Sequence, residues 1–201
     1  MCDLTDEALI LGCREASEER ARALVGELAL RHLDRVVGFL YGLTGDATVA
    51  HDLAQEAFVR VYRHRARYRE VARFSTWLYT IARNLALNEL RNRQRRPLAL
   101  GASAPGEASL HPLEAEAAPG AGPAQAAAEH DLQRAVREAV LALDSPYREV
   151  VVLCDLEERP YAEAAEILGV PIGTIRSRLS RARTRLEQRL RPLLEGEESR
   201  P

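Results

Sequence analysis

One stretch of the chain, residues 161–190, constrains the fold more than any other. Apolar residues in its first part recur at steps of three and four, which predicts one buried stripe on a short helix. The stripe consists of Tyr161, Ala164, Ala165 and Leu168. Gly169 follows, and glycine suits the left-handed position just past a helix C-terminus. Pro171 suits the first position of a second helix, because its missing N–H costs nothing there.

The second predicted helix has one apolar face and one polar face, at roughly 100° per residue. The apolar face consists of Ile175, Leu179, Ala182, Leu186 and Leu190. The opposite face consists of Arg176, Ser177, Ser180, Arg181 and Thr184. The helix holds seven arginines against one glutamate, Glu187. The small side chain of Ala165 is expected where the two helices cross.

This layout is that of a DNA-binding helix-turn-helix, whose second helix enters the major groove. Its arginines create a positive field that attracts the phosphate backbone. We expect Arg176 and Arg181 to read bases, since arginine can donate to both O6 and N7 of guanine. Arg185 and Arg189 lie nearer the packed edge and are expected to hold phosphates. The alternative is an ordinary αα-hairpin with a solvated basic face.

Composition limits the number of domains and the kinds of site that the chain can form. A chain of 201 residues with 46% hydrophobic content can form one large or two small domains. Its three cysteines, Cys2, Cys13 and Cys154, form no CxxC pair, so we expect no metal, cofactor or disulfide framework. Cys154 follows Val150 and Val151 at helical spacing and is expected to be buried. No apolar run approaches 18 residues, so we expect no membrane insertion and a cytoplasmic location.

Residues 97–128 differ in kind from the rest of the chain. They contain five prolines, many alanines and glycines, three glutamates and neither lysine nor arginine. Such a segment cannot bury enough apolar surface to fold, which predicts a flexible acidic linker. We therefore predict an all-α protein with two small helical domains, residues 1–96 and 129–192, and a tail at 193–201.

The boundaries of several helices can be predicted in the same way. Thr44-Gly45-Asp46 separates helices in the first domain, and the next helix is expected over about 47–68. In the second domain a helix is expected to begin near Glu129. Ser145-Pro146 supplies an N-cap and a first-turn proline for another helix, although Val150-Val151-Val152 alone could form a buried strand. Pro192 is expected to end the last helix.

Two surfaces of the first domain carry candidate functional residues. Asp52, Gln55 and Glu56 lie off the apolar face of their helix, where an acidic ridge can be either solvated surface or a docking site. Residues 63–73 hold five arginines beside Tyr62 and Tyr68. Arginines interleaved with aromatic residues suit single-stranded nucleic acid, because a base can stack on a ring while arginine meets phosphate.

Four segments together resemble the bacterial extracytoplasmic-function sigma factors, the minimal two-domain branch of the primary sigma family. In the first domain they are DLAQEAFVRVYR (52–63) and FSTWLYTIARNLALNELRNRQRR (74–96). In the second domain they are SPYREVVVLCDLE (145–157) and YAEAAEILGVPIGTIRSRLSRARTRLE (161–187). The resemblance covers nearly everything except the linker and the tail.

The resemblance implies a non-enzymatic factor that binds core RNA polymerase and directs promoter recognition, DNA melting and transcription initiation. Asp52, Gln55 and Glu56 match the motif that contacts the polymerase clamp helices. The residues expected at the minus-10 element are Arg67, Tyr68, Arg69, Arg73, Phe74, Trp77, Asn84 and Arg91. Those expected at the minus-35 element are Thr174, Arg176, Ser177, Ser180 and Arg181. The second domain would also dock on the polymerase flap, and an anti-sigma factor is an expected partner.

Two other functions compete with this interpretation. A stand-alone helix-turn-helix transcriptional regulator would bind duplex DNA by itself, but it needs a receiver domain or a ligand pocket, and the first domain has the pattern of neither. A catalytic function would rest on His51, Asp52 and Glu56 as metal ligands or acid-base groups. No second ligand cluster accompanies them in the sequence.

Overall fold

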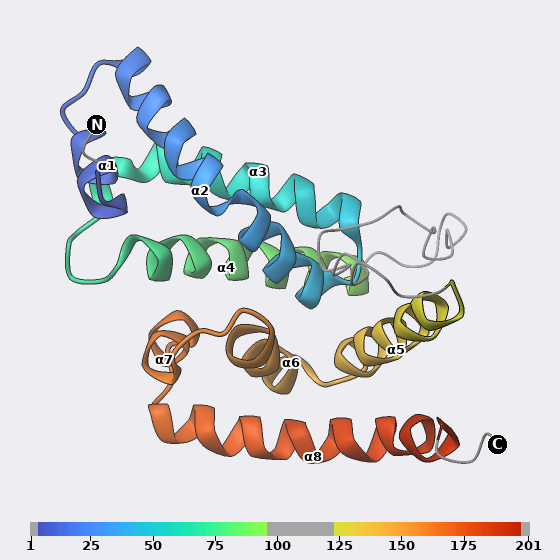
Figure 1. Ribbon diagram of the computed structural model, residues 1–201. Helices are drawn as coiled ribbons and strands as arrows, with labels where there is room; N and C mark the ends of the chain where they lie inside the picture. The colour runs from blue at the N-terminus through green and yellow to red at the C-terminus, as the bar shows by residue number, and fades with distance from the viewer. Residues whose placement is uncertain (1–3, 96–122, 198–201) are drawn as a thin grey trace. The chain divides into compact units, whose positions relative to one another are not determined.

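Figure 1 shows the computed structural model, which describes residues 4–95 and 123–197, without the side chains of 123–129 and 193–197. Every regular element in those ranges is helical, so the prediction of an all-α fold is confirmed. The helices form two compact units, a first domain of α1–α4 and a second domain of α5–α8. Most of the predicted linker, residues 97–122, lies outside the described residues, as do Cys2 and residues 198–201.

In the first domain a long helix packs against two others. The elements are α1 (Asp6–Gly12), α2 (Glu18–Thr44), α3 (Ala47–His64), the 3-10 turn η1 (Arg65–Arg67) and α4 (Phe74–Arg95). The core lies where α2, α3 and α4 meet, and there the Phe39 and Tyr79 rings lie 5.0 Å apart between centroids. The face of α3 that packs against this core buries Ala54, Ala57 and Phe58, whereas Leu53 is only half-buried.

The predicted break after Thr44 is confirmed. Gly45 adopts φ 72°, and its N–H donates to the Tyr41 carbonyl at 2.8 Å, which ends α2. Asp46 then accepts a hydrogen bond from the Val49 N–H at 3.1 Å and starts α3. The predicted end of α3 is wrong by four residues, because the chain tightens at Arg65 and then turns Tyr68 into the core.

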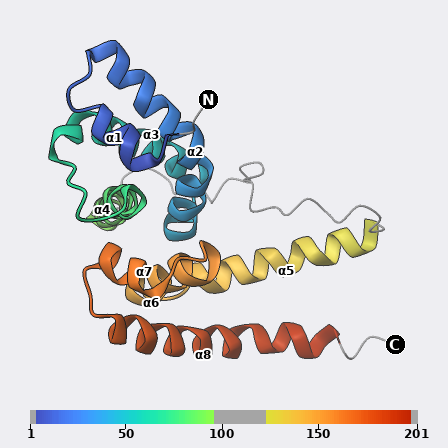
Figure 2. The same ribbon diagram turned by 60° about the vertical axis from the view of Figure 1, so that its left-hand side comes forward.

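In the second domain α5, α6 and α7 all lie on one side of α8 (Figures 1 and 2). The elements are α5 (Pro123–Leu141), α6 (Ser145–Val151), the π-helical turn η2 (Val152–Leu156), α7 (Tyr161–Leu168) and α8 (Ile172–Glu197). The valine run is therefore helical and not a strand. Among the described residues of this domain, no helix lies on the far side of α8.

Two predicted helix ends in this domain are wrong. α5 begins at Pro123, six residues before Glu129, because proline suits a first turn and the alanine-rich residues after it favour helix. α8 continues through Pro192 to Glu197. A proline inside a helix removes one N–H donor, but Pro192 is exposed, so water can reach the carbonyl that loses its partner.

The start of α6 is shifted by one residue from the prediction. Asp144 occupies the N-cap position, and Ser145 is the first helical residue. The Asp144 side chain makes no capping hydrogen bond, because it pairs with Arg185 at 2.7 Å. The Ser145 hydroxyl instead donates to the Glu149 carboxylate at 2.7 Å.

The helix-turn-helix has the predicted turn. Gly169 adopts φ +66°. Its N–H donates to the Glu166 carbonyl at 3.2 Å, while the Val170 N–H donates to the Ala165 carbonyl at 3.1 Å. These two bonds form a Schellman motif, which stops α7 and redirects the chain. Pro171 immediately precedes α8, and the buried small residue of α7 is Ala164, whereas Ala165 is half-buried.

We expect Gly169→Ala to lower the free energy of unfolding by about 1–2 kcal/mol, because only the left-handed backbone resists a Cβ at this position. Apart from Gly169 and its two chain neighbours, no atom of the described residues lies within 4 Å of that Cβ, so steric overlap adds nothing. Gly173 in α8 is a matched control with equally open space but a helical backbone. Gly173→Ala should raise stability by about 0.5–1 kcal/mol. Urea denaturation followed by circular dichroism measures both, and effects of the same sign would contradict the prediction.

Candidate nucleic-acid interface

The predicted two faces of α8 are confirmed by the burial of its side chains. Ile175, Leu179 and Ala182 are at most 2% exposed. The polar side presents Arg176, Ser177, Ser180, Arg181 and Thr184, all of which are exposed. Thr174 is half-buried at the start of the helix, where its carbonyl accepts a hydrogen bond from the Ser177 hydroxyl at 3.1 Å.

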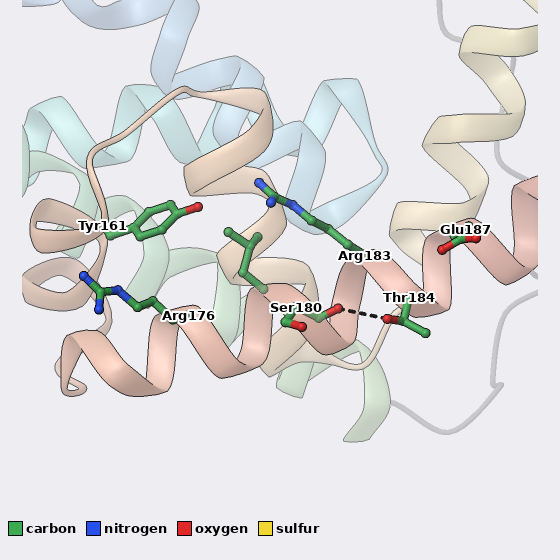
Figure 3. Close-up of a pocket in the computed structure, with 7 residues that line it drawn as sticks. Tyr161, Arg176, Ser180, Arg183, Thr184 and Glu187 are labelled. Atoms are coloured by element: carbon green, nitrogen blue, oxygen red, sulfur yellow. Dashed lines mark hydrogen bonds between the residues drawn. The ribbon is translucent and has the colours of Figure 1, made fainter.

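A groove of about 510 Å³ runs along this polar side (Figure 3). It is lined by Tyr161, Arg176, Leu179, Ser180, Arg183, Thr184 and Glu187. Tyr161 comes from α7, and the sequence pattern placed it only in an apolar stripe. The Tyr161 hydroxyl, the Arg176 guanidinium and the Ser180 hydroxyl supply hydrogen-bond donors, so the groove suits an acceptor-rich ligand such as a base edge or a phosphate.

The arginines of α8 differ in what they contact. Arg183 donates from Nη2 and Nε to the two carboxylate oxygens of Asp155, at 2.6 and 3.2 Å. These hydrogen bonds raise the pKa of Arg183. Arg185 pairs with Asp144 and also lies 4.2 Å above the Tyr147 ring centroid. In this structure the guanidinium of Arg185, which is expected to hold phosphate, is already engaged by an aspartate.

The acidic ridge of α3 faces outward. Asp52 and Gln55 are exposed, while Glu56 is half-exposed and pairs with Arg60 at 2.8 Å. The buried Ala54 and Ala57 lie on the other side of the helix. The ridge is thus available to a partner without any change in the core.

The expected minus-10 residues separate into exposed and buried groups. The exposed ones are Arg67, Arg69, Arg73, Asn84 and Arg91. Trp77 is half-buried, with its ring centroid 5.3 Å from that of Tyr68 and 6.4 Å from that of Phe74. Tyr68 and Phe74 are 2% and 0% exposed, respectively. Both rings lie in an aromatic cluster beneath the loop before α4, so in this structure neither of these two expected minus-10 residues is exposed for a base to stack on.

The loop before α4 is held from both sides. The Tyr68 hydroxyl donates to the Ala72 carbonyl at 2.9 Å, and burial raises the pKa of Tyr68 to about 12. The Phe74 N–H, which begins α4, donates to the Glu7 carboxylate of α1 at 3.1 Å. Asp6 on the same helix contacts His32 of α2 at 2.6 Å. The sequence did not indicate these contacts, because each joins residues that are distant along the chain.

Arg65 also has a structural role that its sequence context did not suggest. Its guanidinium donates to the Cys13 carbonyl at 3.1 Å, the Tyr62 carbonyl at 2.9 Å and the Glu18 carboxylate at 3.0 Å. The Tyr62 hydroxyl donates to Glu18 as well. Arg65 thereby ties the ends of α1 and α3 to the start of α2, and is not part of an exposed nucleic-acid surface.

The described residues offer little for metal or thiol chemistry. They contain no cluster of three or more metal-binding side chains, and none of their helices is long and apolar enough to cross a membrane. Cys13 is buried, and desolvation raises the pKa of its thiol. Cys154 is half-buried rather than buried, and its pKa is raised to about 11, also mainly by desolvation.

Comparison with known proteins identifies both domains. Residues 28–96 match the family Sigma-70 region 2, and residues 133–186 match Sigma-70, region 4. The ECF RNA polymerase sigma factor SigW of Bacillus subtilis is 34% identical over 160 residues, which is 80% of this chain and 85% of that protein. The chain belongs to the ECF RNA polymerase sigma factors. The Sigma-70 region 2 match also disfavours the stand-alone regulator as an alternative.

Other relatives support the assignment of this chain to the sigma factors. The RNA polymerase sigma-H factor of Pseudomonas aeruginosa is 32% identical over 173 residues, 83% of this chain and 86% of that protein. Among solved structures, the sigma factor RpoE in complex with the anti-sigma factor NepR from Bartonella quintana matches with a TM-score of 0.64 and 26% identity. That match covers 83% of this chain and 96% of the other.

We expect Tyr68→Phe to lower the free energy of unfolding by about 1 kcal/mol at neutral pH, because the Ala72 carbonyl loses its donor. The pKa of Tyr68 is about 12 in the folded protein against a usual 10.0, so the unfolded chain loses this proton first. The stability due to neutral Tyr68 is complete below pH 10.0 and is lost as pH rises toward about 12. Urea denaturation over this range should show a steeper loss for the wild type than for Tyr68→Phe, and equal slopes would contradict this.

Proposed function

We propose that this sigma factor binds core RNA polymerase in the cytoplasm, directs it to a specific set of promoters and helps to open the DNA there. The observation that carries the proposal is the outward polar side of α8, on a chain that matches both sigma regions. The factor itself is proposed to be non-catalytic, and the polymerase carries out the chemistry.

The acidic ridge of Asp52, Gln55 and Glu56 is the proposed contact with the polymerase clamp helices. Its side chains are exposed or half-exposed and lie away from the buried alanines of α3, so they can pair with basic residues at little cost to the fold. The second domain is proposed to dock on the polymerase flap. Each domain alone offers a small surface, so polymerase is needed to hold both on the promoter together.

The minus-10 element is proposed to meet the loop before α4 and the exposed side of that helix. Arg67, Arg69 and Arg73 are placed to contact phosphates, and the half-buried Trp77 lies close to the loop they occupy. Asn84 and Arg91 extend this surface along α4. Flipping a base out of the stack costs a few kcal/mol, and a loop already shaped by Tyr68 and Glu7 avoids a further ordering cost.

The minus-35 element is proposed to lie along the polar side of α8. Arg176 and Arg181 are exposed and make no hydrogen bond or ion pair within the described residues, so both guanidinium groups can contact DNA. Ser177 and Ser180 add hydroxyl groups on the same side, and Thr174 lies at the helix start. Arg176 lines the groove beside Tyr161 at this surface (Figure 3).

We also propose that an anti-sigma factor controls this protein. The support is the likeness to RpoE of Bartonella quintana, which was solved in complex with the anti-sigma factor NepR. An anti-sigma factor that covers either proposed polymerase contact would keep the sigma factor from its enzyme.

The first test of function reverses the charge of the acidic ridge. Asp52→Arg with Glu56→Arg should abolish co-elution with core polymerase and transcription from a template selected by the wild-type holoenzyme from a randomised promoter library. The fold should persist, because neither side chain is buried. Glu19→Arg, a reversal of an exposed acid at the start of α2, is the matched control and should leave both readouts intact. Wild-type binding by the double variant would place the polymerase contact elsewhere.

A second test separates base reading from general attraction to DNA. Arg176→Ala should cost the holoenzyme about 1–3 kcal/mol at the preferred minus-35 sequence and relax discrimination against single-base substitutions. Arg189→Ala, further along α8, should weaken all templates alike and reduce the salt dependence. Binding to native and substituted templates over a salt series measures both. Uniform weakening by Arg176→Ala would show that it holds phosphate rather than reads a base.

A further inference from the structure

Two neighbouring arginines of α8 are held by aspartates from outside the helix. Arg183 makes a two-point contact with Asp155 of η2. Arg185 makes one contact with Asp144, which directly precedes α6, and stacks on Tyr147. Arg176 and Arg181, nearer the start of α8, have no such partner among the described residues. The positive charges of Arg176 and Arg181 are therefore available to a ligand, whereas aspartates neutralise those of Arg183 and Arg185.

The two aspartates stand at opposite ends of the segment α6–η2, which packs against α8. Two residues along a helix are about 200° apart around its axis, so Arg183 and Arg185 leave α8 on different sides of the buried Ala182. Arg183 extends toward the side of the groove where Tyr161 lies (Figure 3). Both arginines thus border the surface that is proposed to face DNA.

The exposure of these pairs argues against a mainly stabilising role. The Arg183 and Asp155 side chains are 57% and 26% exposed, and those of Arg185 and Asp144 are 44% and 71% exposed. Ion pairs so open to water contribute little to folding, because water screens them and ordering the side chains costs entropy. Their cost to DNA affinity is of the same order, because each arginine must leave its aspartate before it can meet a phosphate and release counterions.

We propose that Asp144 and Asp155 restrain sequence-independent DNA binding by holding Arg185 and Arg183 away from duplex phosphates. Phosphate contacts strengthen binding to every sequence alike, so limiting them leaves more of the affinity of α8 to Arg176 and Arg181. This inference rests on the proposed contact of α8 with DNA and adds to it the two residues that limit that contact.

The test uses the full-length protein with Asp144→Asn, Asp155→Asn or both, and a short fluorescent duplex without promoter sequence. Asparagine keeps the size of the side chain but not its charge, and circular dichroism checks the fold. Anisotropy titrations should show affinity raised roughly twofold to fivefold per substitution at about 0.1 M salt, since the gain cannot exceed the free energy of the lost ion pair. The plot of log affinity against log salt should steepen by about 0.9 per arginine released.

Asp131→Asn is the matched control, since it removes the same charge and releases Arg134 on α5, 3.1 Å away in another exposed pair. It should leave DNA affinity nearly unchanged. In an Arg183→Ala background, Asp155→Asn should bring no gain. An equal rise with Asp131→Asn, or no rise with either α8-linked variant, would overturn the inference.

The outcome also distinguishes this inference from the function on which it rests. If Arg176→Ala leaves promoter discrimination by the holoenzyme unchanged, the base-reading role of α8 fails, and the restraint fails with it. If Arg176→Ala relaxes discrimination while the asparagine variants bind non-promoter DNA like the wild type, only the restraint fails.

Discussion

Burial of one apolar stripe on α8 is the constraint on which the second domain depends. Ile175, Leu179 and Ala182 are at most 2% exposed, and α8 packs against α5 and α6, which removes this stripe from water. The rotation of the helix about its axis is thereby fixed, and the arginines and serines are forced outward. The left-handed turn at Gly169 sets where this helix begins. Packing thus orients the side chains that are proposed to face DNA before any DNA is present.

The first domain obtains its proposed DNA surface in a different way, through polar contacts from a short helix. Glu7 on α1 accepts from the first N–H of α4, and Arg65 joins the ends of three helices. These bonds shape a loop that has no regular structure of its own. Its exposed arginines therefore project from a backbone fixed by residues far away in the sequence, and losing α1 would loosen the loop as well as the core.

Features that depend on local periodicity or turn chemistry were predictable from sequence, and those that depend on distant partners were not. The two faces of α8, the break at Gly45 and the turn at Gly169 follow from spacing and glycine alone. The burial of Tyr68 does not follow from local sequence, because an aromatic residue among arginines gives the same pattern whether its ring is in the core or on the surface. Nor does the pairing of Arg185, since Asp144 lies 41 residues away. The sequence motifs predicted the family, but the partners of individual side chains could be identified only in the folded structure.

The ionisation of the described cysteines bears on whether oxidants could act directly on this sigma factor. Oxidants attack the thiolate, and a thiol with a pKa of about 11, as at Cys154, is ionised in only about one molecule in ten thousand at neutral pH. Cys13 is buried and its pKa is also raised. Both thiols are therefore poor redox sensors. An oxidative signal would therefore have to act through Cys2, which lies outside the described residues, or through another protein.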